Sequence, residues 1–141
     1  MINKFDGEYA FLSNFYECNI PFAGYIFTST EAAFQAMKTR NPDEREQIDH
    51  LKPGAAQRLG RKINLRSDWE KVKDDIMYLL ISVKFLLHQD LREKLLATGT
   101  EELVEGNTWN DTYWGVCNGV GQNKLGEILM RVREELRHEL H

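Results

Sequence analysis

Apolar side chains recur at helical spacing in the second half of the chain and predict its two main helices. The longest helix should begin at Trp69, after a cap at Ser67 or Asp68, and run to about Gln89. Its expected apolar face consists of Val72, Ile76, Leu79, Leu80, Val83, Phe85, Leu86 and Leu87. A last helix should run from Leu125 to about Leu140, packing through Leu125, Ile128, Leu129, Val132 and Leu136.

Shorter elements are expected between and before these helices. The segment Thr28-Ser29-Thr30-Glu31 has capping-box spacing, so a helix should cover 32–38 and end before Pro42. Residues 43–51 fit either a short helix or a surface loop. Further short elements are one or two helical turns at 55–59 ended by Gly60, a helix at 91–97 ended by Thr98-Gly99, a strand at 103–105, and a functional loop at 107–126.

Aromatic residues are concentrated near the N-terminus, where eight of the fifteen precede residue 28. They alternate with small or polar residues around Pro21 and Gly24, which predicts short strands and a hairpin near 21–24. No internal repeat or linker divides the sequence. We therefore expect a helix-rich α+β single domain over residues 1–141 with a small N-terminal antiparallel β element.

Composition and charge narrow the functional classes. The 141 residues are 42% apolar, which excludes wholesale disorder, and the net charge of −4 disfavours binding nucleic acid by bulk electrostatics. The stretch from Lys52 to Lys73 departs from this average, since it holds seven basic and two acidic residues, a local +5. Such a stretch can be a solvated surface or a phosphate site.

The first residues and the cysteines indicate the cellular location, and the histidines indicate whether a metal site is expected. Residues 1–8 contain no uninterrupted apolar stretch, so we expect no signal peptide and a cytoplasmic protein in which Cys18 and Cys117 are thiols. The four histidines, His50, His88, His138 and His141, have no zinc-site spacing, so no metal is expected.

Two segments could carry chemistry. On a helix, Glu31, Gln35 and Lys38 fall within an arc of about 60°, which places an acid, an amide and an amine on one face. Taken alone, the octapeptide 31–38 favours the simpler interpretation, a capped helix with solvated polar side chains. The second segment, residues 109–123, combines Trp109, Asp111 and Trp114 with three glycines, a composition suited to stacking a base or to a packed loop.

Taken together, these segments resemble the NADAR family, whose members include N-glycosidases acting on riboflavin-biosynthesis intermediates and enzymes that remove ADP-ribose from guanine. The resemblance spans nearly the whole chain and rests on an ordered set of pieces: 12–16, 31–38, Gly60-Arg61, 65–69, 96–99, 103–105, 111–115, 119–126 and 129–133. Two positions depart from the family pattern. Ala32 stands where members commonly have His, and Cys117 stands where they often have Gly.

The resemblance implies cleavage of an N-glycosidic bond between a phosphorylated ribose and its base or amine. It implies catalytic roles for Glu31 as the acid–base group, Lys38 as a nucleophile or an electrostatic clamp, and Asp111 as a carboxylate. The substrate-binding residues expected from the same pieces are Ser13, Asn14, Phe15, Gln35, Arg61, Trp69, Trp109, Trp114, Gly115 and Asn123. No cofactor, metal, membrane or obligate protein partner is expected.

Three alternatives stay open at this point. The substrate is either a riboflavin intermediate or ADP-ribose on guanine, free or in an ADP-ribosylated nucleic acid. A module that binds ADP-ribose or an NAD-derived nucleotide without cleaving it is a second class of function. A purely structural protein leaves the Trp, Gly and Asp cluster unexplained.

Overall fold

The computed structural model describes residues 1–139, whose contacts group into two compact units. Residues 14–84 are called the central unit, and residues 1–13 with 85–139 are called the terminal unit. Helices dominate both units, and the central unit carries a small antiparallel sheet. The predicted helix-rich α+β class is therefore confirmed, whereas the single domain over 1–141 stays a prediction.

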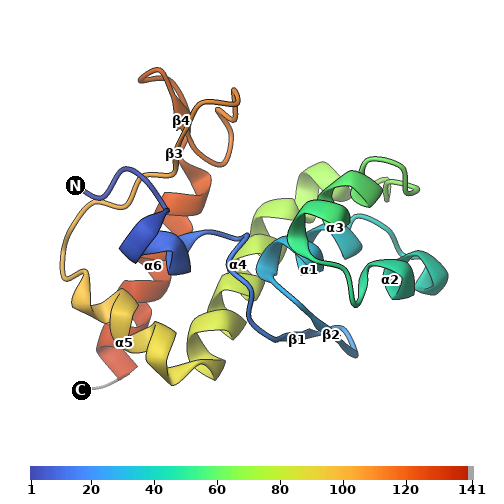
Figure 1. Ribbon diagram of the computed structural model, residues 1–141, viewed down its shortest axis with the longest axis horizontal. Helices are drawn as coiled ribbons and strands as arrows, with labels where there is room; N and C mark the ends of the chain where they lie inside the picture. The colour runs from blue at the N-terminus through green and yellow to red at the C-terminus, as the bar shows by residue number, and fades with distance from the viewer. Residues whose placement is uncertain (140–141) are drawn as a thin grey trace. The chain divides into compact units, whose positions relative to one another are not determined.

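The central unit opens with the predicted hairpin, in which β1 (Ile20–Phe22) pairs antiparallel with β2 (Tyr25–Phe27) (Figure 1). Its turn residues Ala23 and Gly24 both have positive φ, at 53° and 86°. A two-residue turn of this kind matches the twist of the strands it joins, so it sets the register of Ile20 opposite Phe27.

Helix α1 (Thr30–Ala36) follows the hairpin and carries the predicted acid–amide face. The side chain of Ser29 caps it by accepting the N–H of Ala32 at 3.0 Å. The expected capping box was placed one residue early, because Glu31 is the second helical residue and a box requires the third. The helix also ends before Lys38, which lies just beyond the C-cap at Met37.

Three further helices complete the central unit: α2 (Pro42–Ile48), α3 (Pro53–Gly60) and the start of α4 (Trp69–Leu87). Residues 43–51 thus form a helix for most of their length. Helices α2 and α3 both pack against α1 and both begin with proline, whose missing N–H is harmless at a first helical position.

The buried stripe of α4 is narrower than its apolar pattern. Met77, Leu80, Ile81 and Phe85 are buried, but Leu79, Leu86 and Leu87 are about half exposed, so the predicted wide face is wrong at these three positions. Lys84 lies on the buried stripe with its Nζ 5.6 Å from the centre of the Tyr16 ring. Burial lowers the pKa of Lys84 to about 8.

The terminal unit begins with the 3-10 helix η1 (Gly7–Leu12), where the aromatic pattern had predicted strands. The predicted short strand is wrong here. Phe11 and Leu12 are consecutive and both buried, whereas in a strand their side chains would point to opposite faces. The ring of Phe11 meets that of Phe85 edge to face, with centroids 6.5 Å apart. Helices α5 (Gln89–Ala97) and α6 (Lys124–Glu139) pack together. The predicted end of the last helix at Leu140, like His141, lies outside the described residues.

Between α5 and α6, the parallel strands β3 (Gly106–Asn107) and β4 (Val116–Cys117) hold the base of a long loop. The strand predicted at 103–105 is displaced, since Leu103 makes an isolated bridge to Ile2 and the strand starts at Gly106. Within residues 1–139, none of the helices combines the length and apolar character needed to cross a bilayer.

Candidate active site

The carboxylate of Glu31 is buried inside the central unit, with 8% of the residue exposed. Gln35, one helical turn later, donates from Nε2 to Glu31 Oε1 at 2.7 Å. The backbone N–H of Glu31 donates to the carbonyl of Asn14 at 3.1 Å. Helix geometry and these two bonds together hold an acid group in place, which a solvated helix face would not require.

Lys38 follows the C-cap of the same helix. Burial lowers the pKa of its ammonium group, Glu31 opposes this effect, and Arg61 adds to it. Glu31, Lys38 and Arg61 therefore lie close enough to influence one another's charge. A lysine with a lowered pKa is more often neutral near pH 7 than a solvated one, as a nucleophilic role requires.

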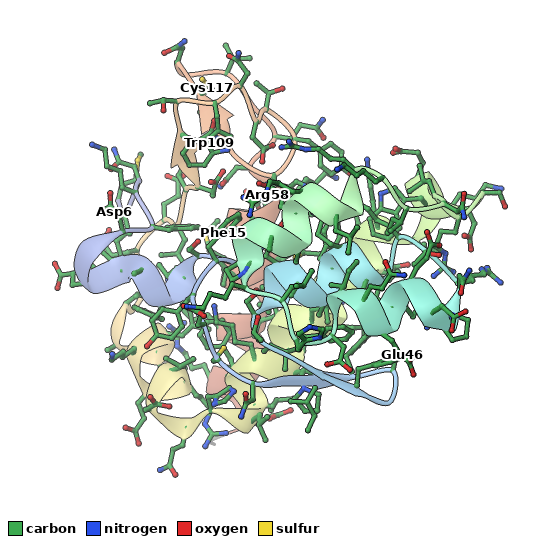
Figure 2. The ribbon with its side chains drawn as sticks, turned by 45° about the vertical axis from the view of Figure 1, so that its right-hand side comes forward. Asp6, Phe15, Glu46, Arg58, Trp109 and Cys117 are labelled. Carbon is green, nitrogen blue, oxygen red and sulfur yellow. The ribbon has the colours of Figure 1, made fainter. Side chains whose placement is uncertain are left out.

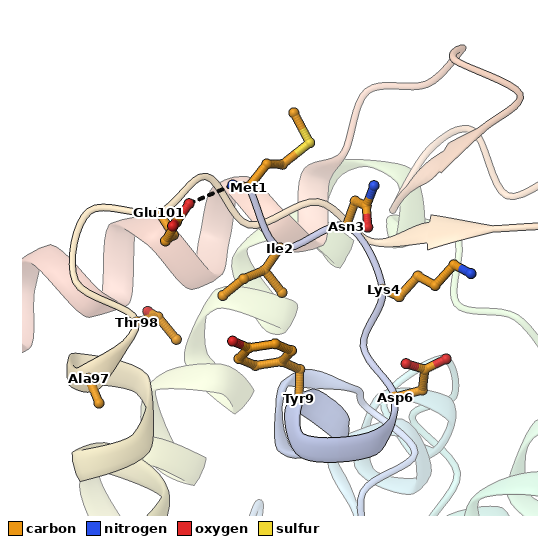
Figure 3. A pocket seen from close by; sticks show the side chains of 9 residues that line it. All are labelled: Met1, Ile2, Asn3, Lys4, Asp6, Tyr9, Ala97, Thr98 and Glu101. Atoms are coloured by element: carbon orange, nitrogen blue, oxygen red, sulfur yellow. Dashed lines mark hydrogen bonds and ion pairs between the residues drawn. The ribbon is translucent and has the colours of Figure 1, made fainter.

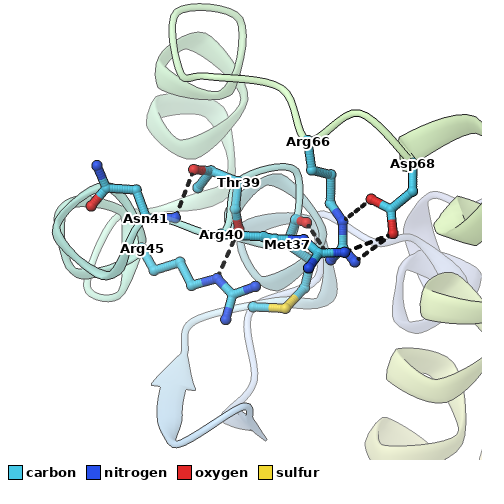
Figure 4. Close-up of polar contacts among 7 residues, drawn as sticks. All are labelled: Met37, Thr39, Arg40, Asn41, Arg45, Arg66 and Asp68. Carbon is cyan, nitrogen blue, oxygen red and sulfur yellow. Dashed lines mark hydrogen bonds and ion pairs between the residues drawn. The ribbon is translucent and has the colours of Figure 1, made fainter.

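Polar contacts fix the backbone that follows Lys38 (Figure 4). The N–H of Arg66 donates to the Lys38 carbonyl at 2.7 Å, and its guanidinium pairs with Asp68 through bonds of 2.6 and 3.0 Å. Arg40 also reaches Asp68, at 2.9 Å. These two guanidinium groups hold the pKa of the Asp68 carboxyl well below its usual range. Arg66 is thus engaged within the protein, whereas Arg61 and Lys62 are exposed and able to meet a phosphate.

Two predicted binding residues of the central unit have clear packing roles. Asn14 accepts from the Thr30 hydroxyl at 2.8 Å and donates to the sulfur of Met77 at 3.5 Å. Trp69 is 6% exposed and packs against Phe34, with ring centroids 4.9 Å apart. Phe15, labelled in Figure 2, is 44% exposed. Contacts of these three residues with a substrate stay predictions.

In the terminal unit, Asp111 organises the loop around it. Its Oδ1 accepts the backbone N–H groups of Tyr113 and Trp114 at 3.2 and 2.9 Å. The side chain of Asn107 bonds both the N–H and the carbonyl of Asp111, at 3.1 and 2.9 Å. At least one Asp111 oxygen is therefore engaged in the turn, and the catalytic role of this carboxylate stays a prediction.

The other predicted residues of this loop are either buried in its backbone contacts or exposed to solvent. Asn123 is 7% exposed and bonds the Glu105 N–H and the Leu103 carbonyl, both at 2.9 Å. Gly115 has no room for a side chain, because a Cβ there would meet Glu105 and Asn107. Trp109 is 67% exposed on the same loop (Figure 2), where its face is available for stacking.

Three further residues of the terminal unit were singled out by the sequence: Ser13, Trp114 and Cys117. The Trp114 ring meets Tyr113 edge to face, with centroids 4.9 Å apart. Cys117, one of the two departures from the family pattern, is buried with its sulfur 3.8 Å from Asn110 Oδ1. Ser13 is the C-cap of η1, and its N–H donates to the carbonyl of Ala10 at 3.0 Å.

Glu105 is a candidate that sequence reasoning missed. Its carboxyl is half-buried, and burial raises its pKa to about 7, with Asp111 adding to the rise and a hydrogen bond from Asn107 opposing it. A group that titrates near neutral pH beside an aromatic loop is a common feature of functional sites. The segment 103–105 belongs to the family resemblance. The burial of the Glu105 carboxyl, however, cannot be predicted from the sequence of this segment alone.

A hollow of about 500 Å³ lies elsewhere in the terminal unit, between the first residues and the end of α5 (Figure 3). Lys4, Asp6, Tyr9, Thr98 and Glu101 are among its lining residues, and none of the predicted site residues lines it. In the described part of the chain, no group of His, Cys, Asp or Glu is arranged to hold a metal ion.

The structure thus gathers the predicted residues in two places. Asn14, Glu31, Gln35 and Lys38 are joined by contacts within the central unit, with Arg61 beside Lys38. Asp111, Trp114, Gly115 and Asn123 are joined within the loop of the terminal unit. The buried acid beside a lysine of lowered pKa makes the first group the candidate active site.

Comparisons with known proteins show the family of the chain. The family model of the NADAR domain matches residues 2–137. An N-glycosidase YbiA from Shigella boydii is 41% identical over 136 residues, covering 94% of this chain and 84% of the relative. A riboflavin biosynthesis protein from Vibrio vulnificus is 38% identical over 136 residues, which are 94% of this chain but 37% of that longer protein.

A solved structure has the same fold. The NMR structure of the Escherichia coli protein YbiA matches with a TM-score of 0.86 and 37% sequence identity, covering 99% of this chain and 88% of the other.

Proposed function

Because the chain belongs to the NADAR domain family, we propose that it is an N-glycosidase that cleaves a phosphorylated ribose from its base or amine in an intermediate of riboflavin biosynthesis. The names of relatives that are 38–41% identical, N-glycosidase YbiA and riboflavin biosynthesis protein, support the reaction class and the substrate. The observation that carries the proposal is the buried Glu31 carboxylate, which influences the charge of Lys38.

Hydrolysis of an N-glycosidic bond passes through a ribosyl group with positive charge at C1′. A buried carboxylate stabilises that charge more strongly than a solvated one, and it can take the proton of an attacking water. We assign both roles, stabilising the charge and accepting the proton, to Glu31. The leaving base or amine departs with the electron pair of the broken bond and then gains a proton.

Lys38 has two candidate roles in the same reaction. As a neutral amine it attacks C1′, and ring opening gives a Schiff base that water then hydrolyses. As an ammonium group it binds an anionic part of the substrate. The lowered pKa favours the first role without excluding the second.

The exposed cations Arg61 and Lys62 are proposed to bind the substrate phosphate. Stacking of a base on Trp109, in the terminal unit, stays a prediction. The cytoplasmic location expected from the sequence stays a prediction.

The test offers the purified protein a phosphorylated riboflavin intermediate and, separately, ADP-ribosyl-guanosine, and detects the released base by mass spectrometry. We expect release from the riboflavin intermediate and a loss of at least about 100-fold in kcat for Glu31→Gln. Release from ADP-ribosyl-guanosine alone would move the substrate to that class. Binding without release from either would identify a binding module and overturn the proposal.

Borohydride added during turnover decides between the two roles of Lys38. A reduced sugar adduct on Lys38 would establish the Schiff base. Full activity of Lys38→Arg without any adduct would leave only the electrostatic role.

A further inference from the structure

The amide of Gln35 is the link between Glu31 and the neighbouring helix α3. Gln35 is 5% exposed, and its Nε2 donates to Glu31 Oε1 at 2.7 Å. Its Oε1 is buried and accepts no hydrogen bond from any described residue. The orientation of the amide follows from Glu31, because the flipped amide would place an oxygen against the carboxylate.

The oxygen of Gln35 is directed at Gly60, the last residue of α3. A Cβ on Gly60 would overlap Oε1 of Gln35 and would fall 2.8 Å from Cδ and 3.1 Å from Cβ of the same side chain. A Cβ atom does not approach another heavy atom to less than 3.0 Å, so any side chain at position 60 would displace the amide. Gly60 is not required for a left-handed backbone, since its φ is not positive. It is required for space.

From this geometry we propose that Gly60 and Gln35 are positioning residues that set the carboxylate of Glu31 for catalysis. The backbone of α3 holds one end of the Gln35 amide, and the other end holds Glu31. The inference rests on the proposed role of Glu31 and adds to it two residues that act through Glu31. It also reassigns Gln35, which sequence reasoning had placed among the substrate contacts.

Gly54 provides a matched control on the same helix. A Cβ at Gly54 would meet a single atom within 4 Å, the flexible terminal Nη1 of Arg58, at 3.7 Å. Gly60→Ala and Gly54→Ala are therefore the same chemical change on one helix, with and without a steric conflict. We expect Gly60→Ala to lower kcat roughly 10- to 100-fold with little change in KM, and Gly54→Ala to retain wild-type kcat.

The double variant tests the proposed linkage. Gln35→Ala removes the Oε1 and Cδ atoms that a Cβ at position 60 would strike and leaves only the 3.1 Å approach to the Cβ of residue 35, so Gly60→Ala should cost much less in that background. Equal losses from Gly60→Ala in both backgrounds would show that Gly60 acts by another route and would overturn the inference.

Gln35→Met keeps the volume beside Gly60 but removes the N–H donor to Glu31, so it tests positioning without opening a cavity. Loss of a donor disfavours the charged carboxylate, and the acid limb of the kcat profile should move to higher pH. A purely structural role would leave that limb in place. This variant also decides the matter if Gly60→Ala does not fold.

Glu31→Gln separates failure of this inference from failure of the proposed function. Inactive Glu31→Gln with wild-type kcat and an unmoved pH profile in Gln35→Met would overturn the inference alone. Wild-type turnover in Glu31→Gln would overturn the role of Glu31 and the inference together.

Discussion

At the scale of single residues, the two tryptophans predicted to bind substrate have opposite environments. Trp69 is buried against Phe34, whereas Trp109 is 67% exposed. The sequence predicts the same substrate-binding role for both. Their different burial indicates that Trp69 contributes to stability and that Trp109 is available to a ligand.

Alanine substitution distinguishes these two roles. Trp69→Ala should lower the free energy of unfolding by about 3–5 kcal/mol, because it leaves a cavity beside Phe34. Trp109→Ala should change it by less than about 0.5 kcal/mol and instead raise KM, since it removes an exposed stacking face. Urea unfolding and steady-state kinetics measure the two effects, and a destabilised Trp109→Ala would contradict the assignment.

Glu105 illustrates how a residue's environment sets its pH dependence. Its folded-state pKa of about 7 exceeds the ordinary value of 4.5. The resulting stabilisation is complete below pH 4.5 and is lost as the pH rises through about 7.

Because the carboxyl is only half-buried and solvent screens part of the effect, the wild-type protein should lose roughly 1–2 kcal/mol of unfolding free energy between pH 4.5 and 8, relative to Glu105→Gln. Urea titrations at several pH values measure this difference. Glu102→Gln, at an exposed carboxylate on the same segment, is the control and should show no such trend.

At the scale of elements, the loop between β3 and α6 is an ordered structure and not a flexible connection. Asp111 and Asn123 each bond two backbone groups within it or at its base. Such side-chain bonds replace the regular ladder that a helix or longer strand would provide.

Asp111 variants separate loop structure from charge. Asp111→Ala should lower the unfolding free energy by roughly 1–2 kcal/mol, because two backbone N–H groups lose their acceptor. Asp111→Asn keeps an acceptor oxygen and should retain wild-type stability. A stable but inactive Asp111→Asn would support the predicted catalytic role of the carboxylate. An Asp111→Asn variant as unstable as Asp111→Ala would contradict the interpretation that Asp111 stabilises the loop by accepting the two backbone N–H groups.

At the scale of the whole chain, charge is unevenly distributed along the sequence. The net charge is −4, yet residues 52–73 carry +5. The structure reduces the part of this stretch available to a ligand, since Arg66 pairs with Asp68 and Lys73 with Glu70. What remains exposed suits one phosphate group better than a long polyanion.

Arg61→Ala with Lys62→Ala should therefore raise KM for a phosphorylated substrate about 10-fold and leave kcat nearly unchanged. Inorganic phosphate should compete with substrate in the wild type and compete less in this variant. Tight binding of duplex DNA at 0.15 M salt, measured by fluorescence anisotropy, would contradict the small-ligand interpretation.

The sequence by itself determined the helix-rich class, the hairpin, the family and the residues of the Glu31 face. Periodicity, turn chemistry and capping are local, so they can be read from neighbouring letters. The 3-10 helix at Gly7–Leu12 and the narrow stripe of α4 were not predicted, because both depend on which side a distant element covers.

Only the tertiary structure decided the surroundings of individual site residues. Packing of α3 on α1 brings Gly60 against Gln35, and folding of the loop buries Glu105 beside Asp111. Each pairing joins residues whose chemistry depends on exclusion of water and on distances of a few ångströms. Burial and close approach arise from packing between segments, and for that reason no local pattern contained them.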